Sequence, residues 1–308
     1  MALKMDPKIL VLFLALIQIK ATKTSPDYHL LSSNGMPPSH PYQTVRTPYK
    51  QQCISMCATS PTECRSFAVQ QDAGWFRCLL FDVTTNVEDL LPSTGMEYFL
   101  DIQSCQDWYR VGARVSGVYE MNLMGKGKRR VSCNMEVSGG GWMVIFRKNK
   151  ASNENFQRTW EEYREGFGDI NREFRMGNEL INRVTNSGAK YYIFVWAKTF
   201  DGNITVSKYG SFYIEEESND YRIHFDDKLL EGFASFGGDN GNNDKNVNGM
   251  GFSTLEIDND GRSGNCAGKH GPSWYNDCSR LHVFKNNKLV WHSPHNYYQI
   301  MEWMIKEM

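Results

Sequence analysis

The sequence lacks three things that would each indicate a function. It has no excess of positive charge, since 34 Lys and Arg residues stand against 35 Asp and Glu residues. Binding to nucleic acid usually needs a basic surface, so a nucleic-acid partner is not expected. The longest apolar run, residues 9–17, falls far short of the roughly 20 residues that cross a bilayer. No C-x-x-C spacing occurs, which argues against a structural zinc site.

Catalytic and stem-forming motifs are also missing. The sequence contains no G-x-S-x-G, no H-E-x-x-H and no phosphate-binding glycine motif, so we do not expect an enzyme. No collagen-like or heptad repeat is present that could form a multivalent stem. His292 and His295 are separated by Pro294, which disfavours a helix that presents both rings to one metal ion.

The amino-terminal segment is typical of a secretory signal peptide. Lys4 and Lys8 precede the apolar run 9–17, and a short polar stretch follows it. We therefore expect residues 1–21 to be a signal peptide and the protein to be secreted and extracellular. In an oxidising compartment the eight cysteines are expected to form disulfides, although eight cysteines allow 105 pairings.

The first part of the expected mature protein divides into a linker and a small module. Residues 22–48 are rich in Ser, Thr and Pro and predict a linker. Residues 49–100 predict a compact unit with a helix near 51–58 and strands near 65–69 and 75–81. The pattern C-x3-C-x6-C-R-S-F-A-V, followed by C-L-L-F, resembles the PAN/apple module. That resemblance implies two disulfides, Cys53 with Cys78 and Cys57 with Cys64.

The remaining two-thirds of the sequence predicts an α+β domain with a loop-rich end. A strand is expected at 140–146, an amphipathic helix at 179–185 and a buried strand at 190–196. Residues 237–252 are rich in Gly, Asn and Asp and cannot themselves fill a core.

This part of the sequence resembles the fibrinogen-related domain, which we expect to span residues 103–308. The resemblance rests on ordered motifs that include S-G-V-Y at 116–119, C-N-M-E at 133–136, G-G-G-W-M-V-I at 139–145, E-F-R-M-G-N-E at 173–179, N-G-M-G-F-S-T at 248–254 and G-N-C-A at 264–267. It implies disulfides between Cys105 and Cys133 and between Cys266 and Cys278. All eight cysteines are then paired, so any homo-oligomer is expected to be non-covalent.

A calcium site is expected in the segment 256–264. Its carboxylates stand at alternate positions before glycines, and hard cations prefer several oxygen ligands in a turning loop. The EF-hand pattern fails, because its twelfth position would be Lys269 rather than Glu. The resemblance instead implies Asp258 and Asp260 as side-chain ligands and Arg262 and Gly264 as carbonyl ligands of Ca²⁺. An Asx-turn loop with solvated carboxylates is the alternative.

Beside that loop, the resemblance implies a ligand pocket. The segment enclosed by Cys266 and Cys278 presents aromatic and polar side chains, as small-ligand sites commonly do. The expected ligand-binding residues are His270, Trp274, Tyr275, Asp277, Cys278 and Ser279, with a cis peptide bond between Asp277 and Cys278.

Two departures from the family pattern affect the expected ligand. The lectin members carry a longer segment with a tyrosine after the second cysteine, whereas this sequence reads Ser279-Arg280-Leu281 and shortens the pocket's far wall. Arg175 stands where the family prefers tryptophan.

The main functional prediction is a secreted, calcium-dependent lectin, similar to ficolins and tachylectins, which binds acetylated or other glycans on microbial or cell surfaces in innate immunity. The alternative is an extracellular ligand or matrix protein that binds a protein receptor. Asn203-Ile204-Thr205 is a possible N-glycosylation site.

Overall fold

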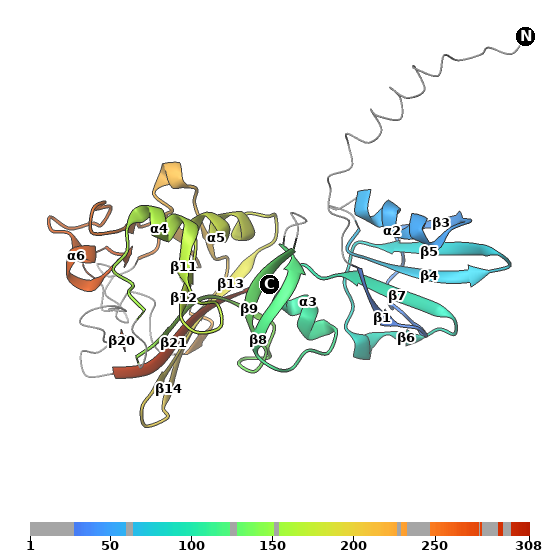
Figure 1. Ribbon diagram of the computed structural model, residues 1–308, viewed down its shortest axis with the longest axis horizontal. Helices are drawn as coiled ribbons and strands as arrows, with labels where there is room; N and C mark the ends of the chain where they lie inside the picture. Colours follow the sequence, from blue (N-terminus) through green and yellow to red (C-terminus); the bar gives the residue numbers. More distant parts are fainter. Residues whose placement is uncertain are drawn as a thin grey trace, which may run out of the picture. The chain divides into compact units, whose positions relative to one another are not determined.

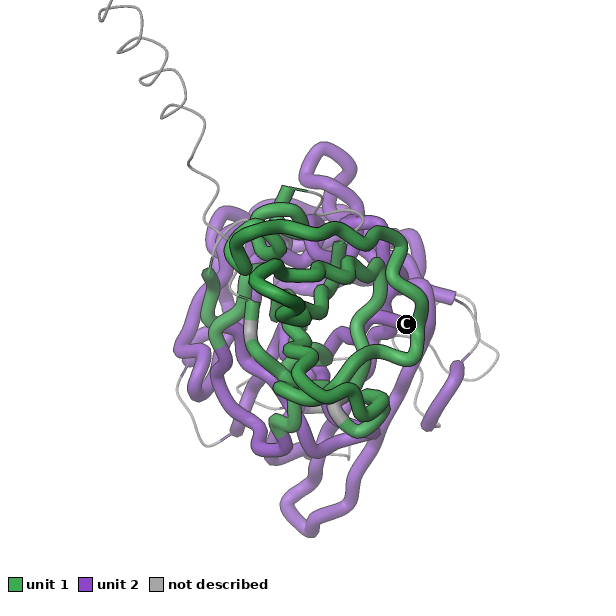
Figure 2. The backbone as a smooth tube through the Cα atoms, turned by 90° about the vertical axis from the view of Figure 1, so that its right-hand side faces the viewer, with its two compact units in different colours: residues 1–113, 120–130 green, residues 114–119, 131–308 purple. Residues whose placement is uncertain are grey.

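A computed structural model describes most of the protein as two compact units. The described residues are 28–59, 64–123, 128–150, 154–226, 229–232, 247–276, 278, 289–291 and 297–308. The first unit comprises the described residues up to Ala113 together with those of Glu120–Arg130. The second comprises Arg114–Tyr119 and the described residues of Val131–Met308 (Figure 2). No helix within the described ranges is long and apolar enough to cross a membrane.

The first unit is built on a five-stranded antiparallel sheet with the order β1-β7-β4-β5-β3 (Figure 1). Its strands are β1 (Tyr28–Ser32), β3 (Gln43–Thr47), β4 (Ser66–Asp72), β5 (Trp75–Phe81) and β7 (Met96–Asp101). The helix α2 (Lys50–Thr59) contacts β3, β4 and β5. A short pair, β2 (Gly35–Met36) with β6 (Leu91–Pro92), and the 3-10 turn η1 (Val87–Asp89) complete the unit.

Both faces of this sheet carry buried side chains, because alternate residues of β4, β5 and β7 enter different clusters. Phe67 and Val69 of β4 pack with Cys53 and Cys57 of α2, while Ala68 packs on the opposite face. The disulfide Cys53–Cys78 ties α2 to β5, and Cys57–Cys64 ties α2 to the segment before β4. These are the pairs that the PAN/apple resemblance implied, and they stabilise a unit whose core is small.

The prediction that residues 22–48 form a linker is wrong for residues 28–47. Strand β1 pairs with β7, and β3 pairs with β5, so this segment supplies both edges of the sheet. An edge strand is held by backbone hydrogen bonds on one side and needs few apolar side chains. The ring of Tyr28 also packs edge-on against Phe67 at 4.8 Å. The compact unit therefore includes Tyr28, and the Ser, Thr and Pro content of the segment was a misleading signal.

The second unit is built on a larger sheet with the central order β11-β12-β10-β21-β13-β14-β17. Its strands are β9 (Lys128–Asn134), β10 (Trp142–Asn149), β11 (Gly166–Gly168), β12 (Phe174–Met176), β13 (Tyr191–Thr199), β14 (Ile204–Tyr209), β17 (Glu231–Gly232), β20 (Leu289–Val290) and β21 (Tyr297–Glu307). The first three residues of β9 belong to the first unit. Strand β9 pairs with β10 and with β8 (Gly117–Asn122), and β20 pairs with β21. Two short ladders lie outside this sheet, β15 (Tyr213–Ile214) with β16 (Ile223–His224) and β18 (Phe252–Ser253) with β19 (Ser273–Trp274).

Short helices accompany the large sheet. They are α4 (Trp160–Glu165), α5 (Asn178–Thr185), α6 (Cys266–His270) and the 3-10 turn η3 (Glu217–Asn219), while α3 (Cys105–Arg110) belongs to the first unit. Figure 1 shows α4 and α5 side by side, next to β11 and β12. Helix α5 buries Ile181 and Val184, which confirms the expected amphipathic helix. The expected strands near 140–146 and 190–196 are β10 and β13.

A buried ion pair joins three strands of the large sheet. The Glu302 carboxylate on β21 accepts hydrogen bonds from Arg147 Nε on β10 and, at 2.9 Å, from Asn134 Nδ2 on β9. Arg147 also donates to Ser132 Oγ at 3.0 Å. The Glu302 side chain is only 6% exposed, so loss of one partner would leave a buried charge, at a cost of about 3–5 kcal/mol.

The first unit contains a carboxyl group whose titration affects stability. Asp101, 5% exposed at the end of β7, accepts a hydrogen bond from Gln103 Nε2 at 2.6 Å. Burial, with a further contribution from the nearby Asp107 carboxylate, raises the pKa of Asp101 to about 6. The folded state therefore favours the protonated acid. This contribution is fully present below about pH 4 and is lost as the pH rises through about 6.

We predict that Asp101→Asn stabilises the first unit at pH 7.5 by about 1–3 kcal/mol, because the amide carries no charge to desolvate. Hydrogen exchange of the β4 and β7 backbone, measured at pH 5 and pH 7.5 with correction for intrinsic rates, reports this unit separately. Asp72→Asn, at an exposed surface ion pair with Arg46, is the matched control and should change little. Equal protection of wild type and Asp101→Asn at pH 7.5 would contradict the prediction.

Candidate functional site

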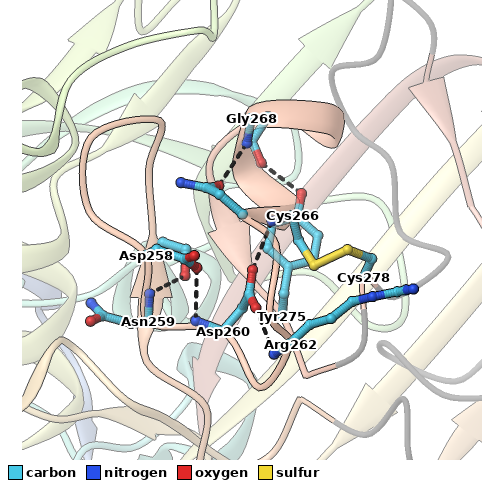
Figure 3. Close-up of a disulfide and its surroundings, with 11 residues drawn as sticks. Asp258, Asn259, Asp260, Arg262, Cys266, Gly268, Tyr275 and Cys278 are labelled. Carbon is cyan, nitrogen blue, oxygen red and sulfur yellow. Dashed lines mark hydrogen bonds between the residues drawn. A yellow bond between two sulfur atoms is a disulfide. The ribbon is translucent and has the colours of Figure 1, made fainter.

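The candidate site is a loop closed at its base by two short strands. In the ladder of β18 and β19, Phe252 lies opposite Trp274 and Ser253 lies opposite Ser273. The intervening residues 254–272 contain the expected calcium segment and helix α6. The disulfide Cys266–Cys278 ties the start of α6 to the segment beyond β19 (Figure 3). Both ends of the loop are therefore anchored, which favours a defined surface.

Two asparagines fold the loop onto this base. Asn259 donates from its backbone N–H to Ser253 Oγ at 3.0 Å and from Nδ2 to the Phe252 carbonyl at 2.8 Å. Asn265 caps α6 by accepting from the Gly268 N–H at 2.8 Å, and its Nδ2 donates to the Thr254 carbonyl. These amide groups tie the loop backbone to the ladder at its base.

The two aspartates expected to bind calcium lie close together in this loop (Figure 3). Asp260 accepts from the Arg262 N–H at 2.8 Å through Oδ1 and from the Cys266 N–H at 2.7 Å through Oδ2. Asp258 is exposed, and its Oδ1 accepts a hydrogen bond from the Asp260 N–H at 3.4 Å. Local desolvation and the closeness of the Asp260 carboxyl raise the pKa of Asp258. A cation would relieve this repulsion, so the donor chemistry fits a hard metal ion.

The expected carbonyl ligands lie on the same turn. Arg262 is exposed, and Gly264 is partly exposed. Gly261 approaches Asn276 so closely that a Cβ atom on it would lie 2.6 Å from Asn276 Oδ1 and 3.1 Å from the Asn276 carbonyl oxygen, so a larger residue would require the Asn276 side chain to move. The described residues contain no group of three or more His, Cys, Asp or Glu side chains placed to hold a metal. Any ion here would therefore depend on backbone oxygens and water in addition to two carboxylates.

The aromatic residues expected to line a ligand pocket are buried. Trp274 is 3% exposed, and its Nε1 donates to the Tyr221 carbonyl at 2.8 Å. Tyr275 is fully buried, and its hydroxyl donates to the Gly271 carbonyl at 2.6 Å. The Trp274 ring packs edge-on against Phe252 at 4.9 Å. Both polar groups are thus already bonded inside the domain, and both rings support the loop.

The other expected ligand residues fall into two groups. His270 at the end of α6 is partly exposed, with its ring 6.4 Å from that of Tyr275. Cys278 is partly exposed, forms the disulfide with Cys266 and has a φ of 39°, which is unusual for a residue other than glycine. Asp277 and Ser279 lie outside the described residues. The expected cis bond between Asp277 and Cys278 and the shortened segment that follows lie there too, as do His292 and His295.

Arg175 lies behind the site as a buried cation. It is 3% exposed and donates to the Met176 carbonyl at 2.9 Å and to Asn178 Oδ1 at 2.8 Å. Its guanidinium lies 5.6 Å from the centre of the Trp274 ring. Burial lowers the pKa of Arg175 to about 10. This residue, where the family prefers tryptophan, therefore supports Trp274 from within the core.

Sequence reasoning missed the contacts that join helix α4 to the loop. The Glu256 carboxylate accepts from the Trp160 backbone N–H at 2.8 Å, and Glu217 accepts from the Trp160 indole at 2.7 Å. Trp160 also lies 5.7 Å from Tyr221, ring centre to ring centre. The capping box of Thr159 and Glu162 was a readable helix-start signal, but nothing local indicated a bond across 96 residues.

The remaining expected modification and disulfide residues are clearly placed. Asn203 is exposed in the turn between β13 and β14, as a glycan acceptor must be. Cys105 and Cys133 are each disulfide-bonded, and the part of the sequence that the structure describes has no free cysteine.

Comparison with known proteins identifies the larger part of the sequence. Residues 102–306 match the family model of the C-terminal globular domain of fibrinogen beta and gamma chains. The protein belongs to this family. Among curated relatives, bovine angiopoietin-4 is 34% identical over 203 residues, which cover 62% of this protein and 39% of that one. Human angiopoietin-related protein 7 is 33% identical over 183 residues, which cover 58% of this protein and 50% of that one. The matched region thus spans half or less of each relative's length.

Solved structures show the same relationship. The fibrinogen-like globe domain of human ANGPTL2 aligns with a TM-score of 0.58 and 28% identity, covering 67% of this protein and 98% of that domain. Lamprey fibrin D-dimer, complexed with the peptide Gly-His-Arg-Pro-amide, aligns with a TM-score of 0.57 and 28% identity, covering 66% of this protein and 72% of that one.

Proposed function

We propose that this protein is a secreted, non-enzymatic ligand or matrix protein that binds an extracellular protein through residues 252–278 of its fibrinogen-related domain. The angiopoietin relatives support a protein partner more than they support the calcium-dependent lectin that the sequence first indicated. The lamprey fibrin structure, a relative of the same fold, was solved with a peptide ligand.

The observation that carries this proposal is the burial of Trp274 and Tyr275. A lectin pocket needs accessible aromatic walls, but these rings are at most 3% exposed and their polar atoms are bonded internally. What the loop exposes instead is Leu255, 66% exposed, together with charged side chains such as Arg262 and Lys269. An apolar side chain within a polar rim is typical of protein interfaces.

Cell binding separates the protein and glycan interpretations. We predict that the secreted protein binds cells that display its partner, and that protease treatment of those cells abolishes binding whereas enzymatic removal of their glycans does not. Leu255→Asp combined with Arg262→Glu should weaken binding about tenfold or more, because it removes the apolar contact and reverses a charge. Tyr213→Asp, on β15 outside this loop and 37% exposed, is the control. A glycan array that is bound only without chelator and is competed by acetylated sugars would instead support the lectin.

We also propose that Asp258 and Asp260 bind one Ca²⁺, with the carbonyls of Arg262 and Gly264 as further ligands. The close carboxylates and the raised pKa of Asp258 support this assignment. When bound, the ion supplies positive charge that holds the turn. The protein's own contribution is to orient Asp260 through the N–H groups of Arg262 and Cys266.

Titration calorimetry tests the calcium site. We predict heat of binding and a raised melting temperature with calcium for the wild-type protein, and neither for Asp258→Asn combined with Asp260→Asn. Asp201→Asn, on an exposed turn remote in sequence, should behave as wild type. Absence of heat and of any melting shift in the wild type would remove calcium from the proposal.

For the first unit we propose a PAN/apple-like module that includes residues 28–101. Its support is a helix tied by one disulfide to a central strand and by another to the neighbouring segment.

Since no cysteine remains for an interchain bond, we propose that any homo-oligomer is non-covalent. Residues 1–21 and Asn203 lead us to propose a cleaved signal peptide and one N-linked glycan.

Intact-mass spectrometry of the secreted, unreduced protein checks these covalent proposals together. We expect a mature protein that begins at Thr22, four disulfides and a mass that falls by one glycan after enzymatic deglycosylation. The Thr205→Ala variant should lack that glycan. A product that retains residues 1–21, or that reacts with a thiol reagent when unfolded, would contradict them.

A further inference from the structure

The β8–β9 hairpin carries a local concentration of positive charge that the overall charge balance hides. Strand β9 begins Lys128-Arg129-Arg130, and all three residues are exposed, whereas the next four residues of the strand are buried. The basic side chains therefore occupy only the outer part of the strand. All three belong to the first unit.

The charge of this segment is largely uncompensated. Lys128 Nζ lies 3.3 Å from the Glu120 carboxylate on β8, with both side chains 56% exposed. In the described parts of the sequence, no hydrogen bond, ion pair or ring contact involves the side chains of Arg129 or Arg130. By comparison, Arg158 and Arg164 of the second unit each pair with carboxylates. Two neighbouring arginines without a counter-charge repel one another, and an external anion would relieve that repulsion.

The strand geometry suits an extended anion. Alternate residues of a strand face opposite sides, so Lys128 and Arg130 share one side, about 7 Å apart along the backbone, and Arg129 faces the other. A flexible polyanion could contact side chains on both sides of the strand, whereas a small ion could not. Guanidinium groups bind sulfate and carboxylate oxygens in a bidentate manner, which lysine cannot reproduce.

The surroundings of the hairpin favour one class of polyanion. Among the described residues, the large apolar side chains that are exposed include none between 116 and 130. The one aromatic side chain in the described residues of β8 and β9 is Tyr119, which is partly buried and donates its hydroxyl to the Val115 carbonyl. These residues therefore offer little surface for stacking with nucleic-acid bases or for insertion into a bilayer. A sulfated polysaccharide binds basic side chains through its anionic sulfate groups and does not need aromatic side chains for stacking.

We propose that Lys128, Arg129 and Arg130 form a binding site for sulfated polysaccharides of the extracellular matrix or cell surface. The site is separate from residues 252–278, so it does not rest on the protein partner proposed above. It would retain the secreted protein close to the cells or matrix that display such polysaccharides. Its contribution would be electrostatic and therefore sensitive to salt.

Binding to immobilised heparin tests the proposal with the full-length secreted protein. We expect the wild type to bind at about 0.15 M NaCl and to lose roughly 20- to 40-fold in affinity between about 0.05 and 0.2 M salt, the value for about three charge contacts released from a charged polymer. The variant Lys128→Gln, Arg129→Gln and Arg130→Gln should lose at least tenfold. Binding should also fall when desulfated heparin replaces heparin.

A matched variant separates this site from net charge. A control variant removes an equal number of positive charges elsewhere, through Arg164→Gln, Arg172→Gln and Arg183→Gln. It should keep a heparin affinity within twofold of the wild type. Melting curves of both variants show whether the fold is retained, and the triple variant Lys128→Arg, Arg129→Lys and Arg130→Lys, which keeps all three charges, should retain most of the binding. Equal losses in the two triple variants, no binding by the wild type, or equal affinity for single-stranded DNA or anionic vesicles would overturn the proposal.

Discussion

The fold of the larger unit depends on the buried carboxylate of Glu302. This one side chain accepts hydrogen bonds from Arg147 of β10 and Asn134 of β9, so it joins three strands, of which β21 is far from the other two in sequence. Strand β21, which carries it, also pairs with β13 and β20. Burying a charge is costly unless it is paired, so the register of all these strands is coupled to one satisfied ion pair. The sheet then supports the aromatic layer beneath the site.

The candidate site follows from that support. Trp274 and Tyr275 face inward and are bonded there, and the loop between Phe252 and Trp274 is held by asparagine amides and a disulfide. The side chains that this loop exposes include Leu255 and charged residues such as Arg262. Arg175, buried with its guanidinium 5.6 Å from the Trp274 ring, is part of the packing that holds this ring on the inner side.

Sequence reasoning succeeded where a signal was local. The apolar spacing of Ile181 and Val184 predicted α5, and the motifs identified the domain that the match over residues 102–306 confirms. It failed where pairing partners are distant, since the edge strands β1 and β3 show little apolar pattern and their composition predicted a linker. Residue type also did not show that Trp274 and Tyr275, which were expected to line a pocket, are buried and have their polar atoms bonded to the Tyr221 and Gly271 carbonyls. A net charge near zero likewise concealed the local cluster on β9.

The position of β21 in the sheet also constrains how the protein reaches its folded state. Residues 297–307 lie between β10 and β13, which are separated from them by about a hundred residues or more in the sequence. Until that segment emerges from the ribosome, the apolar faces and unpaired edges of β10 and β13 lack their central partner. Such long-range pairing folds slowly and exposes strands that aggregate. Folding of this protein therefore depends on the protection of an incomplete sheet during synthesis, and truncation before residue 297 would leave the central sheet without its middle strand.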